Sequence, residues 1–516
     1  MGKIIETRID RFNGGVVNDP RDPREATARM VSNFDALTNP QRLTPYRDSE
    51  SGDSSASTSQ KQNFLIALRT GTTYRLYALG VVSGTARAEV LMKDLTTGSS
   101  DDLDDATWAT PNNNQSSAGS TNFELFVYYR KTGLIYGARA GTHIWAFDPS
   151  SVAVWADSSQ ALTYTNIAQG LVHSKDDILY VPYDNKIAKN DNGSWTTAAL
   201  TLPTHFKINS ICEYGNYLAI ACAPLSGVGK SVVYLWDRDS SLTTLSETID
   251  WGEGDIKVLE ELEGALIGIS LSGNSTTRFN NRLVFKYWTA GTIAKKFQEL
   301  ISSTTGQTSL LIGKLKLDNR LYFMARMYLN GAQRDGVWSV GLGSDGRYSI
   351  VHERTPNNDT AIGAGGVIYN FFFVGDYLFQ SYNSSNTFAL SKTNDSASYT
   401  HTSIYESKRY NGSQIDPAVD SSHKKSLVGI SVTSEYLPSA GQIVAKYRKD
   451  EETSFTTILT NVTDNSISQS AVNIESSGAA LPKEYKEIEF RLESTGGGEI
   501  TAFSFKEEVI GKRSYE

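Results

Sequence analysis

The chain has 516 residues, of which 39% are hydrophobic and 21% charged, so it is too long for one ordinary core and too apolar to be disordered. Its formal net charge of −8 argues against a nucleic-acid-binding protein, which normally has a basic patch. No apolar run approaches the roughly 18 residues that a membrane-spanning helix needs, and the first ten residues lack the apolar core of a signal peptide. We therefore expect a protein of two or more structural units without a membrane anchor.

The first predicted element is an extended segment, RIDRFNGGVVNDPRDPREATARMVSNFDAL, at residues 8–37. Gly14 and Gly15 allow one backbone to approach another closely or to adopt a positive φ. Pro20 and the proline three residues later keep the chain extended and oppose helix formation. Such a segment cannot bury itself on a small core of its own, and it gains stability by adding to the sheet edge or groove of another subunit. We expect residues 1–60 to form an N-terminal assembly arm and linker; a disordered N-terminus is the alternative.

A repeated pattern occupies the chain from about residue 62 to 400. It consists of a turn pair, then a strand with Leu or Ile near its start, then a second strand with a large aromatic residue. The aligned aliphatic residues, which are 39 to 59 positions apart, are Leu76, Ile135, Leu179, Leu218, Leu266, Leu321 and Leu378, and the aromatic residues are Trp145, Trp236, Trp288, Trp338 and Phe388. Three or four strands per repeat match the blade of a β-propeller, which must pack against other blades to bury both of its faces. We predict an all-β chain with an irregular β-propeller of six or seven blades at residues 61–406.

The last part of the chain alternates apolar and polar residues in several short runs. In YKEIEFRLE, the residues Ile488, Phe490 and Leu492 alternate with Glu and Arg, which is typical of a strand with one face in water. At least five such runs predict antiparallel strands, so we expect a C-terminal β-sandwich at residues 407–516. The best candidate for a helix anywhere in the repeats is the short run GTIAKKFQELI at 291–301.

Two glycine-containing motifs are predicted to be turns. GLGSDG at 341–346 fits the pattern G-x-G-x-x-G, but the strand-like runs on both sides favour a hairpin turn over a dinucleotide site, which needs a helix after the glycines. NDNGSW at 190–195 is one residue short of the Asp-box turn of sialidase-type propellers, so we favour a simple turn over a glycan site.

Residues typical of catalysis or metal binding are present but scattered. The six histidines show neither H-x-H nor H-E-x-x-H spacing, and no G-x-S-x-G or Walker motif occurs. A turn near Gly215 would place Cys212 opposite position 219 rather than opposite Cys222, which predicts two free, buried thiols. We therefore predict no catalytic, metal-binding or cofactor-binding residue and no cofactor. A propeller can assemble a site from distant loops, so an enzyme stays open as an alternative.

The opening segment resembles the N-terminal arm of tail proteins from short-tailed bacteriophages, in particular the tail tubular protein B, or nozzle, family. The matching residues, within about 40 positions, are Phe12, Gly14, Gly15, Pro20, Asn33, Phe34, Leu43 and Pro45. RLTPY stands here where the family has an Arg-Pro pair, and the chain is shorter than typical members. The expected layout of arm, propeller and β-sandwich extends the resemblance in outline over the whole chain.

The resemblance implies a non-enzymatic structural protein of the virion, made in the cytoplasm of the bacterial host and assembled into the phage tail. Several copies, expected as a hexameric ring, would contact the tail adaptor on the portal side and the tail fibre proteins. The genome would leave through the ring without specific binding, because an acidic wall repels phosphate. The alternatives are a carbohydrate- or receptor-binding propeller, which the many aromatic residues favour, and a propeller glycosidase.

Overall fold

The computed structural model consists of β-strands and connecting loops, which confirms the predicted all-β fold class. The described residues are 3–51, 60–94, 125–149, 156–272, 282–302, 309–356, 367–393 and 399–512, apart from gaps at 18, 20, 22–25, 71–72, 83–86, 140, 227–228, 242–244, 330–331, 344–345, 375–376, 385–386, 414–415, 420–421, 463–466 and 474–480. Within these ranges the structure contains no helix that is long and apolar enough to cross a membrane.

The contacts between residues divide the chain into two compact units. Unit 1 consists of residues 1–48, 337–359 and 396–516, and unit 2 consists of residues 49–336 and 360–395. The predicted boundaries, with an arm at 1–60, a propeller at 61–406 and a sandwich at 407–516, therefore differ from the observed division. The physical reason is strand pairing, because the N-terminal strands pair with strands near the C-terminus and belong to the same unit.

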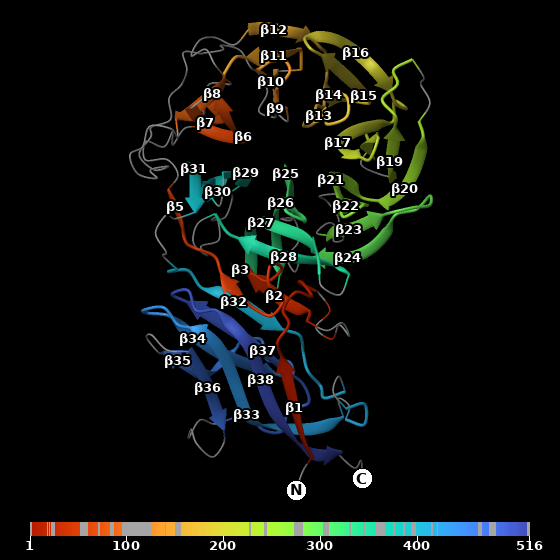
Figure 1. Cartoon of the computed structure of the whole chain (residues 1–516). Coiled ribbons are helices and arrows are strands. Elements are labelled where there is room, and N and C mark those ends of the chain that lie inside the picture. Colours follow the sequence, from red (N-terminus) through yellow and green to blue (C-terminus); the bar gives the residue numbers. More distant parts are fainter. Residues whose placement is uncertain are drawn as a thin grey trace. The chain divides into compact units, whose positions relative to one another are not determined.

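Unit 2 is a β-propeller whose small sheets surround a common axis (Figure 1). Its described strands fall into seven groups. The first four groups are β6 (Gln60–Thr70), β7 (Thr73–Val82) and β8 (Arg87–Asp94); β9 (Phe126–Tyr129), β10 (Leu134–Arg139), β11 (His143–Phe147) and β12 (Ala156–Ala161); β13 (Leu171–His173), β14 (Ile178–Tyr183), β15 (Lys186–Asp191) and β16 (Ser194–Thr201); and β17 (Phe206–Tyr214), β18 (Tyr217–Pro224), β19 (Lys230–Trp236) and β20 (Glu247–Glu253). The other three are β21 (Asp255–Leu262), β22 (Ala265–Ser272), β23 (Arg282–Trp288) and β24 (Lys295–Ile301); β25 (Ser309–Leu317), β26 (Arg320–Leu329) and the first half of β27 (Ala332–Leu342); and β29 (Val367–Val374), β30 (Tyr377–Ser384), β31 (Thr387–Thr393) and β5 (Ser49–Ser51). Consecutive strands of a group are hydrogen-bonded neighbours, as in a propeller blade.

Neighbouring blades contact one another through their first strands, which lie nearest the axis (Figure 1). β17 contacts β21, β21 contacts β25, β25 contacts β29, β29 contacts β6, and β6 contacts β9. The short strand β5 precedes the first blade in sequence but pairs with β31 of the last one, with Ser49 opposite Thr393 and Ser51 opposite Ser391. The two ends of the propeller sequence are thus joined in one blade, which leaves fewer exposed strand edges.

The repeated residues occupy equivalent places in the blades. The second strand of six blades buries its aliphatic residue, namely Ile135, Leu179, Leu218, Leu266, Leu321 and Leu378. The third strand of three blades buries its tryptophan, namely Trp145, Trp236 and Trp288. Trp338 is also buried, but it lies in the second half of β27, which belongs to unit 1. Leu76 and Phe388 lie in β7 and β31, but their side chains are outside the described residues. Edge-on aromatic pairs also pack neighbouring blades together: Tyr180 with Trp236, at 5.8 Å between ring centroids, and Tyr214 with Trp288, at 5.5 Å.

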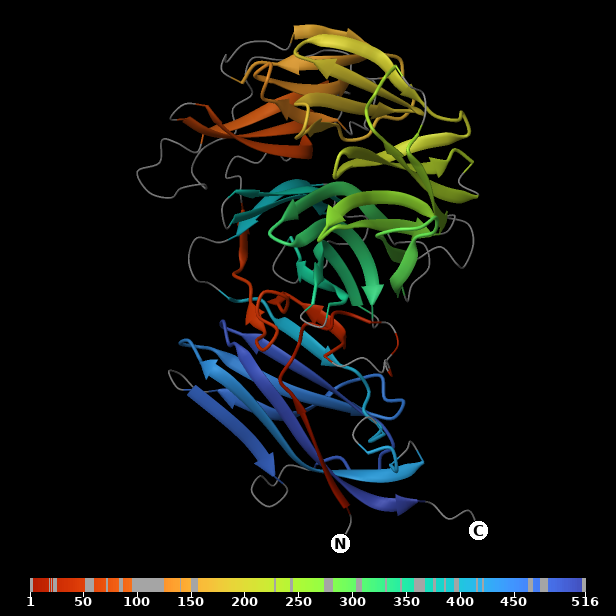
Figure 2. The ribbon, with the colours of Figure 1, turned by 45° about the vertical axis from the view of Figure 1, so that its right-hand side comes forward.

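Unit 1 is a β-sandwich of two sheets (Figures 1 and 2). Sheet A has the strand order β1 (Lys3–Ile9), β38 (Ile500–Lys512), β33 (His423–Tyr436) and β36 (Ile467–Asn473). Sheet B contains the second half of β27, then β28 (Tyr348–Arg354), β2 (Ala28–Ser32), β32 (Ser403–Ser407), β37 (Ile488–Thr495), β34 (Gln442–Lys449) and β35 (Thr456–Val462), and the same unit holds the pair β3 (Phe34–Asp35) and β4 (Thr44–Pro45). Between the sheets, the ring of Phe490 lies 4.9 Å from Phe503 and 4.6 Å from Phe505. The predicted sandwich is therefore present, and N-terminal strands complete both of its sheets.

The predicted turns and thiols agree with the structure. GLGSDG joins β27 to β28, with Gly343 N donating to Arg347 O at 2.7 Å, although two of its residues lie in a gap of the description. NDNGSW forms the turn between β15 and β16, where Asn192 and Gly193 have φ values of 50° and 90°. Cys212 is opposite Ala219, and both cysteines are free and buried.

The best candidate for a helix, at 291–301, does not form one. Residues Lys295–Ile301 form β24, which pairs with β23 from Arg282 to Tyr287. A paired neighbouring strand satisfies the backbone groups of this run, and that tertiary context outweighs its weak helical pattern.

Candidate functional site

The residues that carry the sequence resemblance lie together in unit 1. Phe12 is fully buried, and its ring packs edge-on against Tyr405 of β32 with the centroids 5.3 Å apart. Gly15 has a φ of 76°, and a Cβ atom on it would lie 2.7 Å from Ile350 N. Gly14 N donates to the backbone of the following loop at 3.0 Å. The two glycines do allow close backbone approach, as predicted, but the approaching backbone belongs to the same unit.

The second half of the segment is buried in the same unit. Asn33 has a φ of 60° and is 2% exposed, and Phe34 is fully buried in β3 opposite Pro45 of β4. Leu43 exchanges two backbone hydrogen bonds with Ile500, at 2.9 and 3.2 Å. Pro20 lies outside the described residues. The described residues of the predicted arm up to position 48 therefore pack within unit 1, and the pairing of this segment outside its own subunit stays a prediction.

Unit 1 also contains a Ser–His–Asp arrangement that sequence reasoning missed. His401 Nδ1 is 2.6 Å from Asp48 Oδ1, and His401 Nε2 is 3.4 Å from Ser403 Oγ. This order of groups is that of a nucleophile, a base and an orienting acid. However, Ser403 is fully buried, and its hydroxyl donates to Asn33 O at 2.9 Å. Asp48 also accepts hydrogen bonds from Thr400 N and Oγ1. The Ser–His–Asp group therefore connects the segment before β5 to the segment before β32.

A buried ion-pair network holds sheet B together. Glu489 of β37, whose side chain is 1% exposed, accepts from Arg29 at 3.0 Å, from Arg448 at 2.8 Å and from Arg409 at 3.4 Å. These arginines come from β2, β34 and the segment that follows β32, so one carboxylate joins three parts of the unit. Among the residues that the structure describes, no group of three or more His, Cys, Asp or Glu side chains is placed to hold a metal ion.

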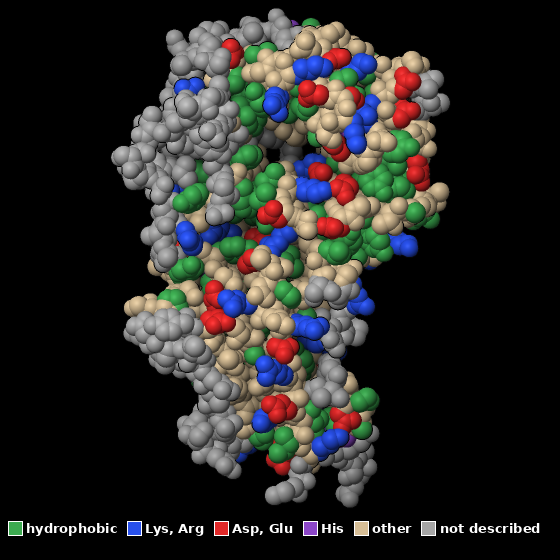
Figure 3. Space-filling view, in the orientation of Figure 1, with side chains coloured by type: hydrophobic (Ala, Val, Ile, Leu, Met, Phe, Trp, Pro, Cys, Tyr) green, Lys and Arg blue, Asp and Glu red, His purple; other side chains and the backbone are tan. Residues whose placement is uncertain are grey.

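The axis of the propeller holds a pocket of about 240 Å³ lined by the inner strands β6, β9, β25 and β29. The space-filling view shows a hollow at the centre of the ring of blades (Figure 3). Val127, Tyr128 and Phe372 are among the partly buried residues of its lining. Gln169 also lines the pocket, where its amide donates to Phe126 O at 2.6 Å and accepts from Phe126 N at 2.9 Å. This amide therefore joins two blades.

Lys314 is the cation in the lining of the axial pocket. Its Nζ donates to Ile211 O at 2.8 Å, to Leu259 O, and to Glu260 Oε2 at 2.8 Å. Ile211 lies in β17, Leu259 and Glu260 lie in β21, and Lys314 lies in β25, so one ammonium group connects three consecutive blades. All three protons of an ammonium group are used by these acceptors. Lys314 thus stabilises the ring instead of presenting its charge to a ligand.

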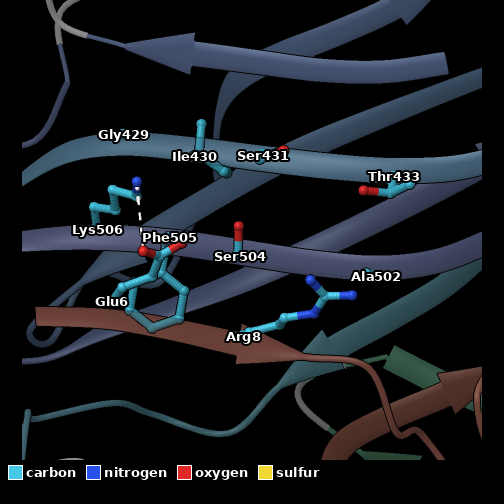
Figure 4. Close-up of a pocket in the computed structure, with 10 residues that line it drawn as sticks. All are labelled: Glu6, Arg8, Gly429, Ile430, Ser431, Thr433, Ala502, Ser504, Phe505 and Lys506. Carbon is cyan, nitrogen blue, oxygen red and sulfur yellow. Dashed lines mark ion pairs between the residues drawn. The ribbon is translucent and has the colours of Figure 1, made fainter.

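A shallow groove of about 260 Å³ lies on sheet A, along β1, β38 and β33 (Figure 4). Glu6 of β1 and Lys506 of β38 point toward one another in this groove, with Nζ and Oε2 3.4 Å apart. Both side chains are about half exposed, so the pair adds little stability. Arg8 and the hydroxyl groups of Ser504 and Thr433 complete a polar surface of mixed charge. Such a surface can hydrogen-bond to another polar chain, and it has no nucleophile with an adjacent base.

The chain is similar to known proteins in structure only, and at low TM-scores. No protein-family model matches the chain, and no curated protein is similar to it in sequence. Among solved structures, it is similar to the extracellular domain of a hybrid two-component system from B. thetaiotaomicron, with 10% identity and a TM-score of 0.42 over 69% of this chain and 41% of that one. The structure of U3-55K gives 9% identity and a TM-score of 0.42 over 67% of this chain and 98% of that one. An exo-β-1,3-galactanase from Phanerochaete chrysosporium gives 9% identity and a TM-score of 0.29 over 90% of this chain and 99% of that one.

Proposed function

We propose that the chain is a non-enzymatic structural component of a short-tailed bacteriophage tail, one copy of a ring through which the genome leaves. The observation that supports this proposal best is the placement of the residues that resemble the nozzle family. Seven of them are described, and they gather in unit 1, where Phe12 and Gly15 contact sheet B and Leu43 pairs with β38. The resembling residues therefore belong to one N-terminal segment, and this segment completes the β-sandwich of unit 1.

The non-enzymatic part of the proposal is supported by the reactive side chains, which are buried or already hydrogen-bonded within the protein. Ser403 is buried beneath the backbone of Asn33, and Lys314 is saturated by acceptors from neighbouring blades. A nucleophile must reach its substrate and must pass its proton to its base. Ser403 is fully buried, and its hydroxyl donates to Asn33 O instead of to His401. Burial also raises the pKa values of Cys212 and Cys222, which makes both thiols poor nucleophiles.

The passage of DNA is supported by the distribution of charge. The formal net charge is −8, and on the face shown in Figure 3 acidic and basic side chains are interspersed without a large basic patch. Basic contacts would bind phosphate and slow the movement of DNA, because each contact releases counterions and adds affinity. A channel wall of low phosphate affinity suits a conduit.

The proposal is tested by imaging and by mass. We expect native mass spectrometry and negative-stain images of the purified protein to show a ring, six copies being the number that the resemblance implies. We also expect antibodies against the propeller to label the tails of the particle that carries the protein. Unlabelled tails together with a protein that never forms a ring would overturn the proposal.

A second candidate function is carbohydrate binding at the propeller axis. It is favoured by the partly buried aromatic residues Tyr128 and Phe372 in the axial pocket, because sugar rings stack on aromatic faces. A glycan array with the wild-type protein and a Tyr128→Ala variant tests it. Binding of a glycan by the wild type and its loss in the variant would favour this candidate over the tail component.

A further inference from the structure

Strand β1 leaves one of its edges open. It pairs with β38 along its whole length, from Lys3 opposite Val509 to Ile9 opposite Phe503, and it ends the strand order of sheet A. Figures 1 and 2 show it as the red strand at the margin of this sheet. In the part of unit 1 that the structure describes, no strand pairs with the other edge of β1. An open edge offers a row of backbone donors and acceptors to a further strand.

The sequence of β1 is complementary to itself. Residues 5–9 read Ile-Glu-Thr-Arg-Ile, with Thr7 at the centre. If two copies of β1 pair antiparallel around a two-fold axis at Thr7, then Glu6 of one copy lies opposite Arg8 of the other, and Ile5 lies opposite Ile9. Residues separated by two positions share a face of a strand, so this register keeps the buried Ile5 and Ile9 on one face and the exposed Glu6 and Arg8 on the other.

The neighbouring two-fold registers are unfavourable. An axis at Glu6 places this carboxylate opposite its own copy, and an axis at Arg8 does the same with two guanidinium groups. Like charges directly opposite one another destabilise a strand pair, whereas opposite charges and β-branched pairs stabilise it. In the favoured register Lys3 faces Arg11, but both are exposed and lie at the ends of the pair, where solvent screens them. The charges of β1 therefore select one register.

The hydroxyl of Thr7 gives an independent indication. Its Oγ1 atom is buried, and within the described part of the chain it has no hydrogen-bond partner. A buried hydroxyl without a partner is costly. In the register centred on Thr7, the hydroxyl of the second copy lies directly across the strand pair, and Thr–Thr hydrogen bonds of this kind stabilise antiparallel sheets.

From these observations we infer that β1 is a self-association strand, which joins two copies of this chain edge to edge through a two-fold axis at Thr7. The two sheets A then form one continuous eight-stranded sheet. The contact is isologous, since the same surface is used by both copies. A ring needs a different, head-to-tail contact, so the β1 pair is a separate interface, expected in protein purified away from any tail. Its failure leaves the proposed function standing, and failure of the tail assignment leaves the β1 pair standing.

A charge swap tests the inference without identifying any other partner. Glu6→Arg places two arginines opposite two arginines, and we expect the dimer dissociation constant from sedimentation velocity to rise about tenfold or more. Adding Arg8→Glu restores opposite charges with their positions exchanged, and we expect the double variant to regain wild-type association. Glu451→Arg, at an exposed position away from β1, is the matched control and should not alter it.

Cross-linking tests the position of the axis. Residues directly opposite in an antiparallel pair have Cα atoms about 4.5–5.5 Å apart, which is within the range of a disulfide. Thr7→Cys should therefore form a disulfide-linked dimer under mild oxidation, whereas Ser504→Cys on β38 should not. The native cysteines are buried and do not interfere. A protein that is monomeric at every concentration, a dimer unaffected by Glu6→Arg, or a dimer in which Thr7→Cys does not cross-link would each overturn the inference.

Discussion

Gly15 and Ile350 approach so closely that a Cβ atom on Gly15 would lie 2.7 Å from the amide nitrogen of Ile350. The next residue, Val16, donates its N–H to Ile350 O at 2.8 Å, so the loop is hydrogen-bonded to β28 at this point. Gly15 also has a φ of 76°, which residues with a Cβ adopt only with strain. Gly15, in the segment that resembles the nozzle family, therefore needs the absence of a Cβ atom for two reasons, the close approach of Ile350 and the positive φ.

The first prediction concerns Gly15→Ala. We expect it to lower the free energy of unfolding of unit 1 by about 3 kcal/mol or more, because the Cβ atom must displace backbone atoms in addition to the strain of the positive φ. Gly346 is the matched control, since it lies in the same unit at a φ of 75° with no atom near its Cβ position. Gly346→Ala should cost about 1 kcal/mol. Urea denaturation, with hydrogen exchange to assign the transition to unit 1, measures both; equal costs would contradict the close-approach explanation.

The second prediction concerns the lysine that joins three blades. Lys314→Met removes the donor for Ile211 O, Leu259 O and Glu260 and leaves that carboxylate in a partly buried place without its cation. We expect a loss of about 2–3 kcal/mol from unit 2, seen as a lower melting temperature. Lys316→Met is the control on the same strand, because Lys316 pairs with Glu261 nearer the surface and should contribute less than about 1 kcal/mol. If the two variants have the same melting temperature, Lys314 does not join the blades.

The propeller was predictable because its evidence is local. Each blade repeats one order of turn, aliphatic strand and aromatic strand within a few dozen residues, and Leu218 and Trp236 show the outcome, since both are buried in adjacent strands. The register at Cys212 was predictable for the same reason, because a two-stranded hairpin fixes its own pairing. The described strands of unit 2 form seven groups, which lies within the predicted range of six or seven blades.

The arm and the Ser–His–Asp group were not predictable in the same way. β1 pairs with β38 at the other end of the chain, and no pattern within residues 1–60 indicates whether such a strand pairs inside or outside its own chain. Asp48 and His401 are 353 positions apart, and the only local sign was a histidine two residues before a serine. The glycines were interpreted correctly as positions of close approach, but the approaching partner, Ile350, depends on tertiary structure.

The third prediction is a dependence of stability on pH. Glu507 is buried in sheet A, and burial raises its pKa, while a hydrogen bond from Tyr485 at 2.8 Å and the charge of Lys425 partly oppose the rise. The folded protein then keeps this proton to a higher pH than the unfolded chain. Unit 1 should therefore lose stability as the pH rises from the ordinary glutamate pKa, about 4.3, through the raised value in the fold.

Two variants measure this effect. Glu507→Gln cannot ionise, so its unfolding free energy relative to the wild type should increase between about pH 4 and pH 7, by roughly 1.4 kcal/mol for each unit of the pKa difference. Tyr485→Phe removes a hydrogen bond that favours the ionised carboxylate, so its stability should fall more steeply with pH than that of the wild type. Denaturant unfolding across this pH range provides the values. A Glu507→Gln curve parallel to that of the wild type would rule out Glu507 as the titrating group.

The last prediction separates the structural interpretation of Ser403 from a catalytic one. A fluorophosphonate probe labels serines that are activated by a histidine and open to solvent. Ser403 is fully buried, and its proton is directed at Asn33 O, so the native protein should remain unlabelled while a serine hydrolase in the same reaction is labelled. Ser403→Ala should instead lower stability by about 1–2 kcal/mol, because Asn33 O loses its buried donor. Labelling of the wild type that disappears in Ser403→Ala would show that the group opens in solution and acts as a nucleophile, and it would favour an enzyme over a tail component.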